Sequence, residues 1–161
     1  MKSTKARCLL LACGNTLRGD DGIGPWLCAW AEERFSGDSR VEAIGRQQWT
    51  PELALDIAEA ETVVFIDCSA ASAPGSVSVQ EVRPAAATQA LGTHHVGAPE
   101  LLNLARELYS SLPRAALLVT VGAGSMDLGE EFSHAVKAAI PEACRVLEKA
   151  VLDCLDAASS F

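Results

Sequence analysis

The most informative segment of the chain reads Gly14-Asn15-Thr16-Leu17-Arg18-Gly19-Asp20-Asp21-Gly22-Ile23-Gly24. It follows a short apolar run, Cys8 to Cys13, and leads into a stretch with helical spacing. A strand, a glycine-rich turn and a helix in this order normally bind an anion, because backbone N–H groups and the helix dipole face a phosphate. Here the turn carries two adjacent carboxylates, Asp20 and Asp21, which would repel a phosphate. The segment therefore predicts a site for a metal ion or another cation.

Length and charge narrow the class of protein. A chain of 161 residues, 49% of them hydrophobic, predicts a single domain over residues 1–161. With 13 basic and 21 acidic residues the formal net charge is -8, which argues against nucleic acid or an anionic membrane as partner. The first apolar stretch is shorter than the roughly 7–15 residues of a signal-peptide core, so it is expected to be a strand of the mature protein.

The cysteines form no C-x-x-C pair, and five of the six lie in apolar segments. Free cysteine behaves as a small hydrophobic residue, so we expect reduced thiols in the core and a cytoplasmic protein. The six are Cys8, Cys13, Cys28, Cys68, Cys144 and Cys154.

Alternating strand and helix patterns predict an α/β fold with helices on both faces of a mostly parallel sheet. The expected strands are residues 7–13, 41–45, 61–68, 77–82 and 115–121. The expected helices are 22–35, a second that starts at 50 and has its last apolar residue at 58, 99–112 and 133–156. Thr50 is expected to cap the second helix, with Pro51 at its first position. Only eight residues separate Cys68 from the fourth strand, and a parallel crossover needs about a dozen. The fourth strand is therefore predicted to be antiparallel and at a sheet edge.

Helical spacing also predicts which side chains pack inward. Trp26 is expected on the apolar face of the first long helix with Ile23 and Leu27, and Leu108 on the inner face of the third. Pro141 is expected to kink the last helix.

Polar residues that follow the strands form the candidate site, because ligands of such folds bind outside the carboxyl ends of the strands. Asp21 follows the first strand, Asp67 closes a buried strand, and His94 lies in the loop before the third helix. Two carboxylates and one imidazole suit zinc, nickel or a similar divalent ion. Asp20 is interpreted instead as a helix cap or a partner of the helix dipole. His95 is interpreted as a surface residue, or as one that contacts a metal ligand rather than the metal.

Four segments together resemble the hydrogenase maturation endopeptidases, which trim the C-terminus of the large subunit of nickel–iron hydrogenases. They are the acidic turn Gly14–Gly24, Phe65-Ile66-Asp67, His94-His95-Val96-Gly97 and Val119-Thr120-Val121-Gly122. The resemblance implies a three-layer α/β/α sandwich on a five-stranded mixed sheet whose fourth strand is antiparallel.

The resemblance also implies a function. Asp21, Asp67 and His94 match the family's metal-binding and catalytic residues, so the chain is expected to be a nickel-dependent endopeptidase. Its substrate would be a hydrogenase large-subunit precursor that supplies the nickel, with zinc or cadmium as substitutes in vitro, and the enzyme is expected to be a monomer. One segment departs from the family: Gly45–Leu53 replaces the Asp-Gly-Gly-Thr segment of many members, and resembles a subgroup associated with soluble, bidirectional hydrogenases.

Three alternatives remain at this stage. The glycine turn would also suit a non-catalytic metal or nucleotide binder on a Rossmann-like sheet, although its glycine spacing is wrong and its acidic pair opposes a phosphate. Six thiols would suit a redox protein, although none is paired in sequence. Aminopeptidase-like and spore-protease-like hydrolases share the broad architecture.

Overall fold

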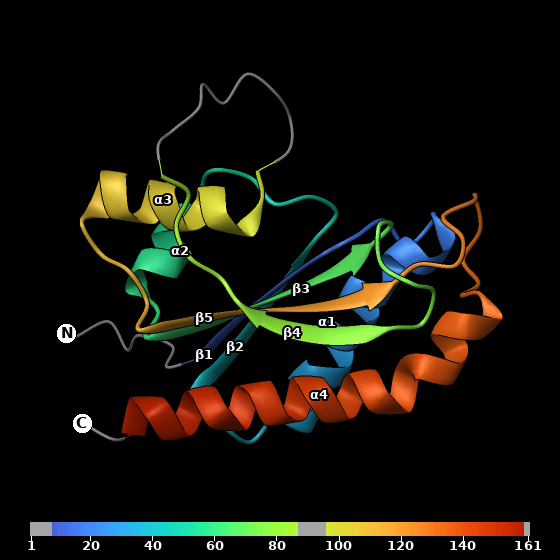
Figure 1. Ribbon diagram of the computed structural model, residues 1–161. Helices are drawn as coiled ribbons and strands as arrows, with labels where there is room; N and C mark the ends of the chain where they lie inside the picture. The colour runs from blue at the N-terminus through green and yellow to red at the C-terminus, as the bar shows by residue number, and fades with distance from the viewer. Residues whose placement is uncertain (1–7, 87–95, 160–161) are drawn as a thin grey trace.

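A five-stranded sheet forms the centre of the computed structural model, which describes residues 8–86 and 96–159 (Figure 1). The strands are β1 (Cys8–Cys13), β2 (Val41–Arg46), β3 (Thr62–Ser69), β4 (Val77–Glu81) and β5 (Ala115–Gly122). The helices are the short 3-10 helix η1 (Gly19–Gly22), α1 (Ile23–Arg34), α2 (Leu53–Glu59), α3 (Ala98–Tyr109) and α4 (His134–Ser159). The predicted alternation of strands and helices is confirmed.

The strands lie in the order β2-β1-β3-β5-β4. All neighbouring pairs are parallel except β4 with β5, and β4 lies at the sheet edge. The short connection 70–76 thus produces the predicted antiparallel fourth strand. From β1 the chain proceeds to β2 on one side, and the later strands lie on the other side. The order of strands therefore reverses between β1 and β3, which is where a ligand site is expected in such a sheet.

Helices cover both faces of the sheet and make three layers (Figure 1). Successive side chains of a strand point to opposite faces, so β1 sends Leu10 into the core beneath α1 and α4, and Leu9 into the core beneath α2 and α3. In β3, Ile66 likewise lies in the core beneath α1 and α4, and Phe65 lies in the core beneath α2 and α3. The predicted α/β/α sandwich is confirmed.

The beginning of α2 differs from the prediction. The helix begins at Leu53 with no side-chain cap, and Thr50 instead opens a turn in which its carbonyl accepts a hydrogen bond from the Leu53 N–H at 3.1 Å. The Ala54 N–H likewise donates to the Pro51 carbonyl at 3.0 Å, so the chain makes tight turns of the 3-10 type before the α-helical bonds begin. In α4, Pro141 lies inside the helix as expected, and the first turns of the helix bend away from its long axis (Figure 1).

Two residues predicted to face inward are exposed. Trp26 is 38% exposed, because the buried stripe of α1 runs through Ile23, Leu27 and Ala31. Leu108, in the last turn of α3, is 61% exposed, because the buried part of that helix ends at Ala105. Within the described parts of the chain, no helix combines the length and the apolar character needed to cross a bilayer.

Candidate functional site

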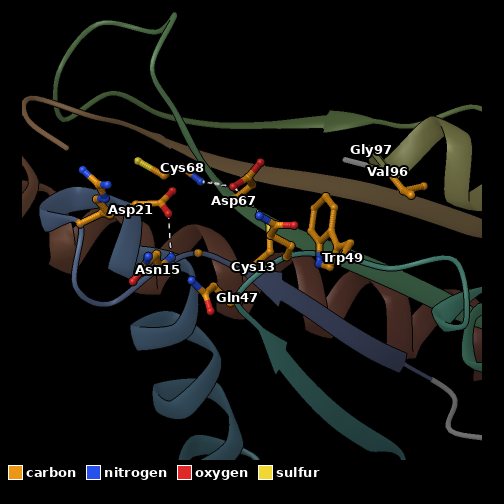
Figure 2. Close-up of a pocket in the computed structure, with 12 residues that line it drawn as sticks. Cys13, Asn15, Asp21, Gln47, Trp49, Asp67, Cys68, Val96 and Gly97 are labelled. Atoms are coloured by element: carbon orange, nitrogen blue, oxygen red, sulfur yellow. Dashed lines mark hydrogen bonds between the residues drawn. The ribbon is translucent and has the colours of Figure 1, made fainter. Parts of the chain in front are cut away.

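A cavity of about 440 Å³ opens at the carboxyl ends of β1 and β3, where the strand order reverses (Figure 2). Its wall includes Asp21 from η1, Asp67 and Cys68 from β3, and Val96 and Gly97 from the segment that enters α3. The predicted residues Asp21 and Asp67 therefore line the same cavity. His94 and His95 lie outside the described residues.

Close packing of the acidic turn against β1 explains its glycines. Gly14 has φ +152°, and a Cβ there would lie 1.9 Å from the Asp21 carbonyl oxygen. A Cβ on Gly24 would lie 2.2 Å from the Cys13 carbonyl oxygen. Only glycine fits at either position, so these two residues let the turn and the start of α1 sit directly on the end of β1. This packing brings Asp21 to the cavity.

The Asp21 carboxylate occupies the anion-binding position of its own turn. Its Oδ2 accepts a hydrogen bond of 2.6 Å from the Asn15 N–H, the kind of backbone donor that binds a phosphate in a nucleotide-binding turn (Figure 2). A nucleotide phosphate would have to displace a carboxylate there. This geometry disfavours the Rossmann-like nucleotide binder.

Asp67 is held through one of its two oxygens. Oδ1 accepts hydrogen bonds from the Cys68 N–H at 2.8 Å and the Cys13 S–H at 3.4 Å. Burial raises the pKa of Asp67, the bonds from Cys13 and Cys68 oppose that shift, and the negative charge of Asp21 adds to it. Both bonds fall on Oδ1, so Oδ2 is the oxygen left to bind a ligand.

These observations fit a cation in the cavity. Ionised Asp67 is disfavoured by burial and by Asp21, and a positive ion between the two carboxylates would relieve both effects. Arg18 also lines the cavity, but among the described residues it forms no ion pair with either carboxylate. Residues 8–86 and 96–159 contain no cluster of three or more His, Cys, Asp or Glu side chains able to hold a metal. Asp21 and Asp67 could therefore supply only part of a coordination shell.

Asp20 has a different environment, although it adjoins Asp21 in sequence. It is fully buried, does not line the cavity, and accepts bonds from the N–H groups of Gly124, Ser125 and Ser133 and from Ser133 Oγ, all at 2.7–2.9 Å. Burial alone would raise the pKa of Asp20, but these donors outweigh it and lower the pKa. Ser133 in turn caps α4, since its Oγ accepts from the Val136 N–H. Asp20 therefore does not cap its own helix, since neither η1 nor α1 has a side-chain cap; its carboxylate instead binds the loop before α4.

Sequence reasoning missed the other residues of the cavity wall. Cys13 and Cys68, expected to be core thiols, line the cavity. Burial raises the pKa of both thiols, that of Cys68 to about 12, so both are protonated and poorly suited to redox chemistry. A signal was present: β1 pairs with β3 through Ala12 and Ile66, which makes Cys13 and Asp67 the next residues in register.

The segment that departs from the family pattern also reaches the cavity. Gln47, Gln48 and Trp49 line it. The Trp49 ring packs edge-on against Phe65 with a centroid distance of 5.2 Å, which fixes this wall to the core. The unusual residues are thus placed where they would contact a substrate.

No family model and no curated protein matches the chain. Solved structures do. The hydrogenase 2 maturation peptidase from Thaumarchaeota archaeon SCGC_AB-539-E09 is 28% identical over 89% of this chain and 97% of its own, with a TM-score of 0.64. The [NiFe] hydrogenase maturation protease HybD from Thermococcus kodakarensis is also 28% identical, over 90% and 99%, with a TM-score of 0.64.

The hydrogenase maturating endopeptidase HybD from E. coli shares the fold at 22% identity, over 91% and 93% of the two chains, with a TM-score of 0.68. Fold and site together therefore define an α/β protein that is similar in structure to the hydrogenase maturation endopeptidases. The resemblance stated from sequence is confirmed by these neighbours, which match nearly the whole chain.

Proposed function

We propose that this protein is an endopeptidase of hydrogenase maturation that removes the C-terminal extension of a nickel-loaded large-subunit precursor. The observation that carries the proposal is the pair of carboxylates, Asp21 and Asp67, that face one cavity at the switch point of a sheet with this fold. Two solved structures that are 28% identical to the chain, over 89% and 90% of its length, are maturation peptidases by name, which supports the same function.

In this mechanism the nickel arrives with the substrate, and the chain's own residues recognise it. Asp67 Oδ2 and the Asp21 carboxylate bind the cation, while the Asn15 N–H, the Cys68 N–H and the Cys13 S–H hold the two carboxylates in place. A nickel ion held there can polarise the scissile carbonyl or lower the pKa of a bound water. Recognition through the metal would let the enzyme bind loaded precursor and reject empty precursor.

His94 is proposed as the third ligand. It is two residues from Val96, which lines the cavity, so their Cα atoms are within about 7 Å of each other by chain length alone. Imidazole must be neutral to bind a metal, so binding should weaken as the pH falls through about 6.5. His94→Ala should abolish processing, whereas His95→Ala should retain it. The reverse result would assign the ligand role to His95.

The free protein is proposed to hold no tightly bound metal, because the proposed ligands are two carboxylates and one imidazole, with no thiolate and with open positions. Elemental analysis of purified protein should find well under one equivalent of nickel. Zinc or cadmium added in excess should bind weakly. We further propose that the enzyme works as a monomer in the cytoplasm, where its six free cysteines would remain reduced.

Incubation with purified precursor tests the proposal. The protein should release a short C-terminal peptide from nickel-loaded precursor and leave nickel-free precursor intact. Asp67→Ala should stop the release. Asp153→Ala, which removes an exposed carboxylate paired with Lys149 on α4, is the matched control and should cleave normally. Full cleavage by Asp67→Ala would contradict the proposal.

A further inference from the structure

Three large apolar side chains are exposed around the acidic turn. Leu128 is 77% exposed, Leu17 55% and Trp26 38%. Together with the partly buried Pro25 and Phe132 they form a surface that we call the apolar ridge. Single exposed hydrophobic residues need no explanation, but a group of them on one surface commonly marks an interaction site.

The members of the ridge are neighbours in space although they come from two distant segments. The Gly129 N–H donates to the Leu17 carbonyl at 2.8 Å, and the Gly19 N–H donates to the Gly129 carbonyl at 2.8 Å, so the loop that carries Leu128 lies along the turn after β1. Trp26, Pro25 and Phe132 line one hollow of about 290 Å³.

The loop that carries Leu128 is tightly anchored. Asp20 binds the N–H groups of Ser125 and Ser133, which lie on either side of Leu128 in sequence, and the two bonds of Gly129 hold the middle. Leu128 is therefore presented to solvent by a loop whose ends are fixed. A preorganised surface loses less conformational entropy when a partner binds, which favours affinity.

The ridge is continuous with the candidate active site. The cavity and a second hollow share Gly14, Asn15 and Gln47. That second hollow shares Thr16 and Pro25 with the hollow at Trp26. The three hollows therefore adjoin one another along the acidic turn, between the carboxylates and the ridge, and we call them together the recess.

We propose that the apolar ridge is the docking surface for the folded body of the protein substrate, whose C-terminal segment then follows the recess to Asp21 and Asp67. This proposal rests on the proposed function, because only a protein substrate needs to contact both places at once. The partner surface should be apolar, with Leu128 and Trp26 as the main anchors. A second group of exposed apolar residues near the end of α3 is a poorer candidate, because Leu108 is about 16 Å along the helix from Gly97 at the cavity.

Binding of precursor to a cleavage-deficient protein, Asp67→Ala, tests the docking surface by calorimetry. Adding Leu128→Asp should weaken the Kd for nickel-loaded precursor by about tenfold or more. Adding Leu17→Asp should weaken it less, because Leu17 is less exposed. Leu108→Asp introduces the same charge at a site of similar exposure and should leave the Kd unchanged. In otherwise wild-type protein, Leu128→Asp should raise KM and leave kcat nearly unchanged.

The outcomes separate this proposal from the proposed function. If wild-type protein cleaves loaded precursor and Leu128→Asp cleaves it with the same KM, the ridge is not the docking surface but the function stands. A loss of binding with Leu108→Asp alone would move docking to α3. A dimer in sedimentation analysis that Leu128→Asp converts to monomer would assign the ridge to a second copy of the chain and overturn the proposal. If wild-type protein neither binds nor cleaves loaded precursor, both proposals fail.

Discussion

The carboxylates of Asp20 and Asp67 lie in opposite environments: the loop around Asp20 supplies many hydrogen-bond donors, and the cavity around Asp67 supplies few. Asp20 is surrounded by four donors, which lower its pKa, and it has no contact with the cavity. Asp67 has two donors, both on one oxygen, and burial raises its pKa. A carboxylate with its hydrogen bonds satisfied stabilises the fold, whereas one left partly unsatisfied retains the capacity to bind a ligand.

The turn that carries Asp20 and Asp21 serves both purposes at adjacent positions. Its first carboxylate fastens the turn to the loop before α4, and its second faces the cavity. The hydrogen bonds of Asp20 hold the turn in place, and this keeps Asp21 at the cavity. Substitutions of Asp20, Asp21 and Asp67 should therefore separate effects on stability from effects on function.

Asp20→Ala should give the largest effect on stability. It removes the acceptor of three backbone N–H groups and one hydroxyl in a buried location, so we expect a loss of about 3 kcal/mol or more in the free energy of unfolding. Asp21→Ala should unfold close to wild type and yet fail to process precursor. Urea denaturation of both variants measures the difference. Equal stability of the two variants would contradict the distinction between Asp20, which stabilises the fold, and Asp21, which faces the cavity.

The loss of folding stability at low pH should depend on Asp20. Its folded pKa is lowered, so its stabilising contribution is fully present above the unfolded pKa of about 3.9 and is lost as the pH falls toward the folded value. Below about pH 4 the wild type should therefore lose stability more steeply than Asp20→Asn. Thermal unfolding between pH 2.5 and 7 measures both slopes. If the stability of the two proteins falls with pH in parallel, another group controls the loss of stability at low pH.

The fold could be predicted from the sequence because its signals are local. The apolar run of β3 predicts a buried strand, and the short connection to β4 predicts the antiparallel edge strand. Helix ends and faces were less predictable. Thr50 offers a capping hydroxyl, but tight 3-10 turns precede α2, which begins at Leu53. Trp26 fits an apolar face by spacing, although tertiary packing buries a different stripe.

The site was predictable only in part. Asp21 and Asp67 follow strands, so topology alone brings them together. The role of Asp20 depends on Gly124, Ser125 and Ser133, which are more than 100 residues away, and no spacing rule connects them. Contacts of that kind require the folded chain.

Asp67→Asn should make the protein more stable and less active. The folded pKa of Asp67 is raised, so this carboxyl group costs stability at every pH above its unfolded pKa of about 3.9, including neutral pH. Asparagine keeps an acceptor for the Cys68 N–H and the Cys13 S–H but carries no charge. We expect Tm at neutral pH to rise by about 2–4 °C while processing is lost. A lower Tm would show that the charge is compensated by groups beyond those described.

Substitutions of Cys13 should give the smallest and most specific effect. The Cys13 thiol is a weak donor to Asp67 Oδ1, and the stronger Cys68 N–H binds the same atom, so loss of the thiol alone should only loosen the carboxylate. Cys13→Ala should lower kcat by about three- to tenfold, as expected for one hydrogen bond of about 1 kcal/mol. Cys13→Ser, which restores a donor, should recover most of that loss. Cys144→Ala removes a partly buried thiol of α4 that does not line the cavity or the recess, and it should not change kcat. If Cys13→Ser and Cys13→Ala are equally impaired, the thiol acts through packing, and the orientation of Asp67 depends on the Cys68 N–H alone.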